Sequence, residues 1–290
     1  MTDRRGVIFV GGTRFSGADA VAGLIADHPG VTPIPLAVRI HSDSWGIPAL
    51  LHGRIGLDDL AEGLRGHEIA ERVPCERLEA ALTALRSGYH ADPLQACRDL
   101  FWTLIDELVP HAGGETLVEA SPGSLVEAHT LRRLVPDARF VHVVRDGRDV
   151  AAAAVDSDAV NVHRMPAALE WWAGELREIE RGVRGEEDGA AYAIPEKRLA
   201  VVVLEELTDS GAQAAYGRLL EGVSLGEDGD VASSLARLDA AAIGTGRWRN
   251  RVRGPARWRT TRRYERTLKE LEDEGNHAAP ALRAAYDRHG

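Results

Sequence analysis

The stretch Gly6–Pro29, GVIFVGGTRFSGADAVAGLIADHP, decides how this sequence is interpreted. Val7–Val10 is a short apolar run rich in β-branched residues, which is typical of a buried strand. Residues 11–17 form a glycine-containing turn, and from Ala18 onward small and apolar residues recur at helical spacing. The stretch therefore predicts a strand, a tight loop and a helix, which is the opening unit of an α/β domain.

The predicted loop is suited to binding an anion. Its backbone N–H groups would face the ligand, the following helix would present the positive end of its dipole, and Arg14 would add a full charge. A phosphate or a sulfate fits this chemistry. Glycine-rich turns also join strands to helices in proteins that bind nothing there, so the loop alone leaves both interpretations open.

The loop departs from the phosphate-binding loop of nucleoside triphosphatases. Gly12 and Gly17 have the spacing of the G-x-x-x-x-G-K-[ST] motif, but Ala18 stands in the lysine position and Asp19 in the hydroxyl position. The groups that bind the β/γ-phosphates and magnesium are thus both missing. A kinase remains only a distant alternative.

The rest of the chain continues the alternation of strands and helices, which predicts an α/β fold with a central parallel sheet flanked by helices. We interpret residues 1–290 as a single domain, with 57–108 as a helical insertion or cap and 43–56 as a surface loop. Further strands are expected at Val31–Ile40, Thr116–Pro122, Arg139–Val144 and Leu199–Leu204, and further helices at Leu94–Leu108, Leu125–Leu134, Pro166–Val183 and Ala212–Leu220.

Composition narrows the functional classes. The chain has 290 residues, is 44% hydrophobic and carries a net charge of −10, which does not favour a nucleic-acid partner. Cys75 and Cys97 are too few for a disulfide framework or a zinc site. The first residues enter a core strand without a signal peptide, and no apolar run reaches the length of a membrane span. We therefore expect a soluble, cytoplasmic protein with no membrane partner; the sequence does not indicate an oligomeric state.

Two further segments carry chemistry suited to anions. Arg145 and Arg148 follow the strong strand at Arg139–Val144, and residues 244–250 form a Gly-x-Gly loop with arginines around Trp248. In a parallel sheet, ligands bind at the carboxyl ends of the strands, so these segments can meet the first loop. Singly, each arginine could equally pair with a nearby carboxylate. Together, the three segments predict a ligand with several anionic groups.

The chain resembles the sulfotransferases that use 3′-phosphoadenosine 5′-phosphosulfate (PAPS). FVGGTRFSGADAVAGLIADHPGV is similar to the family's 5′-phosphosulfate loop, PDARFVHVVRDGRDVAAA to its 3′-phosphate segment, IGTGRWRN to its late nucleotide-covering loop, and LAVVVLEELTD to its fourth-strand segment. The resemblance covers most of residues 6–270. It implies a P-loop-like sulfotransferase fold, with 244–290 as the covering loop and terminal helix.

The resemblance also implies the site residues. Those expected to contact PAPS are Arg14, Phe15, Ser16, Gly17, Ala18, Asp19, Arg145, Ala153, Arg247, Trp248 and Arg249. Arg14 and Arg39 would stabilise the transferring sulfuryl group, and a general base would accept the acceptor's proton. The candidates are His41 first, because of its intrinsic pKa, then Glu119, then His28. The scheme requires no metal, and the acceptor would be a small molecule.

Four positions depart from the family pattern. Ala18 lacks a hydroxyl, Asp19 would place a carboxylate near the phosphosulfate, Ala153 replaces a serine eight residues after Arg145, and Ala37 stands where the tyrosyl-protein branch has its catalytic glutamate. These changes leave two hypotheses open. The first is a PAPS-dependent sulfotransferase that acts on a hydroxyl or amine of a small molecule. The alternative is a sulfotransferase-fold protein that has lost this activity and binds a ligand or catalyses another reaction in the same pocket.

Overall fold

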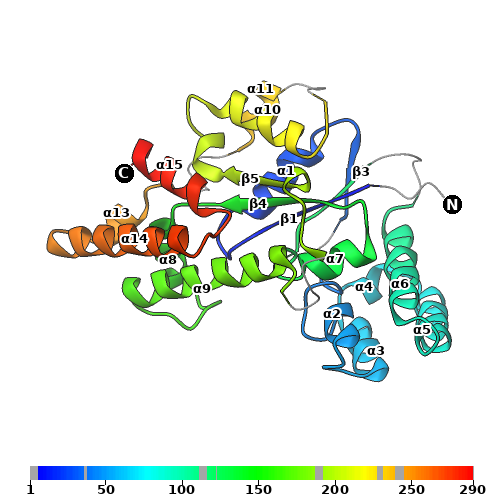
Figure 1. Cartoon of the computed structure of the whole chain (residues 1–290). Helices are drawn as coiled ribbons and strands as arrows, with labels where there is room; N and C mark the ends of the chain where they lie inside the picture. The colour runs from blue at the N-terminus through cyan, green and yellow to red at the C-terminus, as the bar shows by residue number, and fades with distance from the viewer. Residues whose placement is uncertain are drawn as a thin grey trace.

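A computed structural model describes residues 6–35, 38–110, 116–121, 123–186, 192–226, 231–238 and 245–289. Its centre is a parallel sheet in the order β2-β3-β1-β4-β5 (Figure 1). The strands are β1 (Val7–Gly12), β2 (Val31–Pro33), β3 (Thr116–Glu119), β4 (Arg139–Val144) and β5 (Leu199–Val203). The sheet and its flanking helices confirm the predicted α/β fold class.

The two faces of the sheet are covered by different helices. On one face lie α1 (Ala18–Ala26), α10 (Ala212–Gly222) and α11 (Val231–Ala236), and Val21 and Leu219 pack there against inward-facing strand residues such as Ile8. On the other face lie α7 (Ala128–Leu134), α8 (Gly147–Asp156) and α9 (Met165–Arg184) (Figure 1). Because strand side chains alternate between faces, Phe9 points into this second core.

The part of the chain between β2 and β3 forms a block of helices, which lies near one edge of the sheet (Figure 1). It comprises α2 (Ile47–Leu51), α3 (Leu57–Gly66), α4 (Ile69–Arg72), α5 (Cys75–Tyr89) and α6 (Pro93–Leu108). The start of α6 follows from local chemistry, since Pro93 suits the first helical turn and the Asp92 side chain accepts a hydrogen bond from the Gln95 N–H at 3.0 Å. Phe101 of α6 packs in the same apolar cluster as Phe9, so the block shares the core of the sheet.

Two segments differ from the sequence prediction. The second strand was expected at Val31–Ile40 but ends at Pro33, because Pro35 has no N–H to donate and Arg39 takes a positive φ of 54°. Residues 43–56 were expected to be a surface loop, but they contain α2, whose Ile47 and Leu50 are buried in the core beside the sheet. Apolar residues at the i and i+3 positions of such a short helix give little signal in a sequence.

The end of the chain returns to β4 and α9. It forms α13 (Trp248–Arg251), α14 (Pro255–Asp273) and α15 (Ala279–His289). Tyr264 of α14 is buried against Trp172 of α9, with ring centroids 5.5 Å apart. This packing fixes the start of α13, which carries the late arginines, close to the carboxyl end of the sheet.

Candidate active site

One large cavity, of about 1380 Å³, lies where the strands end. Its wall takes residues from the carboxyl end of β1, from the segments that follow β2, β3 and β4, and from the first loop: Gly12, Arg39, Ser121, Arg145 and Thr13–Gly17. This is the edge at which parallel sheets bind ligands. The volume exceeds the roughly 300–1,000 Å³ of most small-molecule sites, so two ligands can lie side by side in it.

The first loop is held in a shape that few residues permit. Gly17 has φ +86°, and a Cβ there would lie 2.7 Å from Leu204 Cδ2, so both conformation and space require glycine. Phe15 also has a positive φ, of 64°. Ser16 Oγ is buried and has no hydrogen-bond partner in the described residues, although Ser16 lines the cavity. An unpartnered hydroxyl at this position fits an anion-binding loop.

Arg145 connects the loop to β4. Its side chain is only 7% exposed, and its Nη1 donates to the Phe15 carbonyl at 2.9 Å, so the guanidinium is held beside the loop at the cavity wall. Two turns further along, Ala153 of α8 lines the same cavity. The structure thus brings Arg145, Ala153 and the loop into one wall.

Asp149 holds the late loop against α8. Its carboxylate accepts hydrogen bonds from the Gly246 N–H at 2.6 Å and the Trp248 N–H at 2.9 Å. Asp149 lines the cavity and is almost completely buried, and this burial raises its pKa even though the two N–H donors favour the charged form. Ile243 and Gly244, the first part of the predicted covering loop, lie outside the described residues.

The structure places Arg247, Trp248 and Arg249, which were expected to contact the nucleotide, in different surroundings. Arg247 lines the cavity. Trp248 is buried instead, with Arg148 stacked 4.4 Å from its ring centroid and Arg249 at 5.5 Å. Neither Trp248 nor Arg249 contributes to the cavity wall, so Trp248 acts in this structure as a packing partner for arginines.

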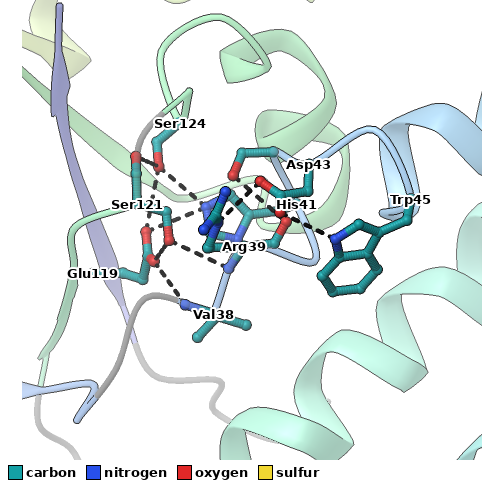
Figure 2. A network of polar contacts seen from close by, with 9 residues as sticks. Val38, Arg39, His41, Asp43, Trp45, Glu119, Ser121 and Ser124 are labelled. Carbon is teal, nitrogen blue, oxygen red and sulfur yellow. Dashed lines mark hydrogen bonds and ion pairs between the residues drawn. The ribbon is translucent and has the colours of Figure 1, made fainter. Parts of the chain in front are cut away.

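On the opposite side of the cavity, Arg39 is fixed by polar contacts (Figure 2). Its Nε donates to Asp43 Oδ1 at 3.0 Å, and the other Asp43 oxygen accepts from Trp45 Nε1 at 3.0 Å. The Arg39 backbone N–H donates to Ser121 Oγ at 3.3 Å. Arg39, Asp43 and Ser121 all line the cavity, so this network forms its second polar wall.

His41, the first choice for the general base, lies below that wall. It is fully buried, and its Nε2 lies 3.1 Å from Ser124 Oγ and 3.2 Å from Glu119 Oε2 (Figure 2). Burial acts to raise the pKa of Glu119, but contacts with His41, Ser121 and the Val38 N–H outweigh it and leave the pKa lowered.

None of the three candidate bases lines the cavity. Glu119 is 1% exposed and His28 6%, and the His28 ring contacts the Gly226 carbonyl instead. In this structure a direct contact of His41, Glu119 or His28 with an acceptor would require the cavity wall to change, so their role as base stays a prediction. His41 and Glu119 support the wall carrying Ser121 and Arg39, and Ala37 lies outside the described residues.

Several carboxylates that sequence reasoning did not assign to the site line the cavity wall, among them Asp149 and Glu175. Glu175 projects from α9 and accepts a hydrogen bond from the Arg14 backbone N–H; partial burial raises its pKa, and Arg14 offsets part of that effect. The Arg14 side chain turns to the Ala159 carbonyl, to which Nη1 donates at 3.1 Å. The available signal for Glu175 was the amphipathic pattern of α9, which places it one turn before the buried Ile179.

Within the described ranges, no helix is long and apolar enough to cross a membrane. No curated protein matches the chain. Among solved structures, the chain is similar to the sulfotransferase domain of the olefin synthase of Synechococcus PCC 7002, with 17% identity and a TM-score of 0.50 over 91% of this chain and 95% of that one. It is also similar to the sulfotransferase domain from the curacin biosynthetic pathway, with 14% identity and a TM-score of 0.54 over 93% and 98%.

These similarities show a shared fold. The sequence itself carries the stronger result, because a profile described as the sulfotransferase family matches residues 7–210. The matched region includes the first loop and the Arg145 segment that form the cavity wall, and it confirms the resemblance seen in the motifs. The chain belongs to the sulfotransferase family.

Proposed function

We propose that the protein transfers a sulfuryl group from PAPS to a hydroxyl or amine of a small-molecule acceptor. The observation that carries the proposal is the position of Arg145, a nearly buried cation that lines the cavity and binds the backbone of the first loop. A buried guanidinium needs anionic or carbonyl partners, and its planar group of N–H donors matches the oxygens of a phosphate. Donor and acceptor together explain the size of the cavity.

The residues fit the donor in part. Arg145, Ser16 and the loop backbone would hold its phosphates, and Arg247 would approach from the late loop. When bound, PAPS supplies the activated sulfuryl group and the leaving phosphate. The chain's own contribution is to position both ligands, to hold Arg39 against Asp43 on the opposite wall, and to offset the charge that develops during transfer.

The proposal is tested by titration calorimetry with adenosine 3′,5′-bisphosphate, the nucleotide product. Arg145→Ala should weaken binding about tenfold to hundredfold, because a hydrogen bond to a charged group is lost. Arg145→Lys should bind the nucleotide with an intermediate affinity, since lysine keeps the positive charge but lacks the paired N–H donors of the guanidinium. Arg259→Ala, which removes an exposed arginine of α14 away from the cavity, is the matched control. Equal affinities for all four proteins would overturn the role of Arg145.

A second candidate function has its own supporting observation. Six carboxylate residues line a cavity proposed for an anion: Asp19, Asp27, Asp43, Asp149, Asp156 and Glu175. The alternative is therefore a sulfotransferase-fold protein that no longer uses PAPS and whose pocket takes a less anionic ligand. Absence of any binding of adenosine 3′,5′-bisphosphate to a folded wild-type protein would favour it.

A further inference from the structure

Glu175 of α9 is a carboxylate in contact with the first loop. It accepts a hydrogen bond from the backbone N–H of Arg14, and both residues line the cavity. The contact is supported by packing nearby, since Phe15 of the loop meets Trp171 of α9 at a ring distance of 6.2 Å. The Glu175 carboxylate therefore occupies one backbone N–H group of the first loop.

The position of Glu175 along α9 also matters. One turn further on, Ile179 lines the cavity together with Val126, and Gly182 packs so closely on the Val126 carbonyl that a Cβ would lie 2.1 Å from it. The helix therefore runs from the first loop to the segment after β3. Glu175 lies between the loop and the part of the cavity formed by Ser121, Gly123 and Val126.

We propose that Glu175 is the general base of the transfer reaction and that anion binding in the first loop releases it. A loop N–H cannot serve Glu175 and a phosphate at the same time, so Glu175 gives up this contact when the loop is filled. The freed carboxylate then lies at the boundary between donor and acceptor. This inference rests on the proposed function and adds the identity of the proton acceptor.

The chemical step balances without a further reactant. The acceptor oxygen forms the new bond to sulfur, and the bond from sulfur to the phosphate oxygen breaks, with its electron pair leaving on adenosine 3′,5′-bisphosphate. The proton of the acceptor hydroxyl moves to a Glu175 oxygen. Burial already raises the pKa of this carboxyl, which makes it a stronger base than an exposed glutamate.

The proposal predicts opposite effects of one substitution on binding and on rate. Glu175→Gln should bind adenosine 3′,5′-bisphosphate about threefold to tenfold more tightly, because the loop N–H is no longer held by a charged group and a repulsion is removed. The same variant should transfer sulfuryl from PAPS to phenol about 10²–10⁴-fold more slowly, the usual contribution of a general base. Glu178→Gln, on the exposed side of the same helix, is the control.

A second acceptor separates base catalysis from structural damage. At about pH 8.5, 4-nitrophenol is largely ionised and needs no base, whereas phenol, with a pKa near 10 like that of tyrosine, keeps its proton. Glu175→Gln should therefore be slow with phenol and close to wild type with 4-nitrophenol. Equal losses with both acceptors, or unchanged rates with both, would overturn the proposal.

The remaining outcomes are also decisive. If Glu175→Gln does not fold, Glu175→Asp takes its place. Its shorter side chain should slow sulfuryl transfer to phenol more than transfer to 4-nitrophenol. Equal slowing with both acceptors would count against Glu175 as the base. A wild-type protein that binds adenosine 3′,5′-bisphosphate but transfers sulfuryl to neither phenol nor 4-nitrophenol would overturn the role of Glu175. A wild-type protein that does not bind the nucleotide would overturn the proposed function itself.

Discussion

The contact between Asp149 and the late loop makes a quantitative prediction. Asp149→Asn keeps one oxygen acceptor but turns the other into an NH₂ group that faces an N–H donor, so one of the two hydrogen bonds, at 2.6 and 2.9 Å, is lost. A hydrogen bond to a charged group contributes about 1.5–3 kcal/mol. Because burial raises the pKa of Asp149, removing its charge also relieves a desolvation cost. We expect a net loss of about 1–2 kcal/mol in the free energy of unfolding.

For a chain of this size, that loss corresponds to a fall in Tm of about 2–8 °C. The assay is thermal unfolding followed by tryptophan fluorescence, since Trp248 is packed directly beside the bond that changes. Asp156→Asn is the matched control, because the ion pair of Asp156 with Arg251 lies on the surface, where such pairs contribute at most about 1 kcal/mol. A Tm for Asp149→Asn no lower than that of the control would refute the reasoning that this carboxylate anchors the loop.

Two further predictions concern charge. Burial holds the pKa of His142 well below its ordinary value of 6.5, with His277 as a second cause, so the folded state resists its protonation. The contribution of His142 to stability should be complete above about pH 7.5, and it should fall by about 1 kcal/mol between pH 6.5 and 5.5. Urea unfolding at both pH values measures this, and the same fall in His142→Gln would show that another group is responsible. Asp19→Asn should tighten binding of adenosine 3′,5′-bisphosphate, more at low salt than at high salt, and lower stability by about 0.3–1 kcal/mol because an acidic residue leaves the first turn of α1. Unchanged or weaker calorimetric affinity would mean that the Asp19 side chain does not face the ligand.

The fold could be predicted because strong local patterns carried it. The apolar run before the first loop and the run before Arg145 form adjacent central strands, β1 and β4. The prediction was less accurate for short elements. The helix α2 is too short to show a clear helical period in the sequence. The second strand ends early at prolines, and their effect on the hydrogen bonds of the sheet depends on the pairing of β2 with β3.

Residues that come directly after a strand could be placed at the cavity from the sequence. Residues whose position depends on how helices pack against the sheet could not. Arg145 and the first loop occupy positions that topology alone assigns to a ligand edge. The burial of His41 could not be predicted, because nothing in its neighbours along the chain shows that it lies beneath the cavity wall, with its ring tilted against that of Phe9 at a centroid distance of 5.3 Å. Glu175 was overlooked because a glutamate on an amphipathic helix looks like a solvated side chain until α9 is placed beside the loop.

The sheet order also bears on synthesis. Of the five strands of the sheet, β1 is synthesised first and is the middle strand, and its Val7 pairs with Leu117, about 110 residues later. At about 5–20 residues per second, this apolar strand remains without its neighbour for roughly 5–20 s. Throughout that interval it exposes both faces and both edges to other nascent chains. The interval between the synthesis of β1 and that of β3 is therefore one in which shielding of this apolar strand would protect the growing chain from aggregation.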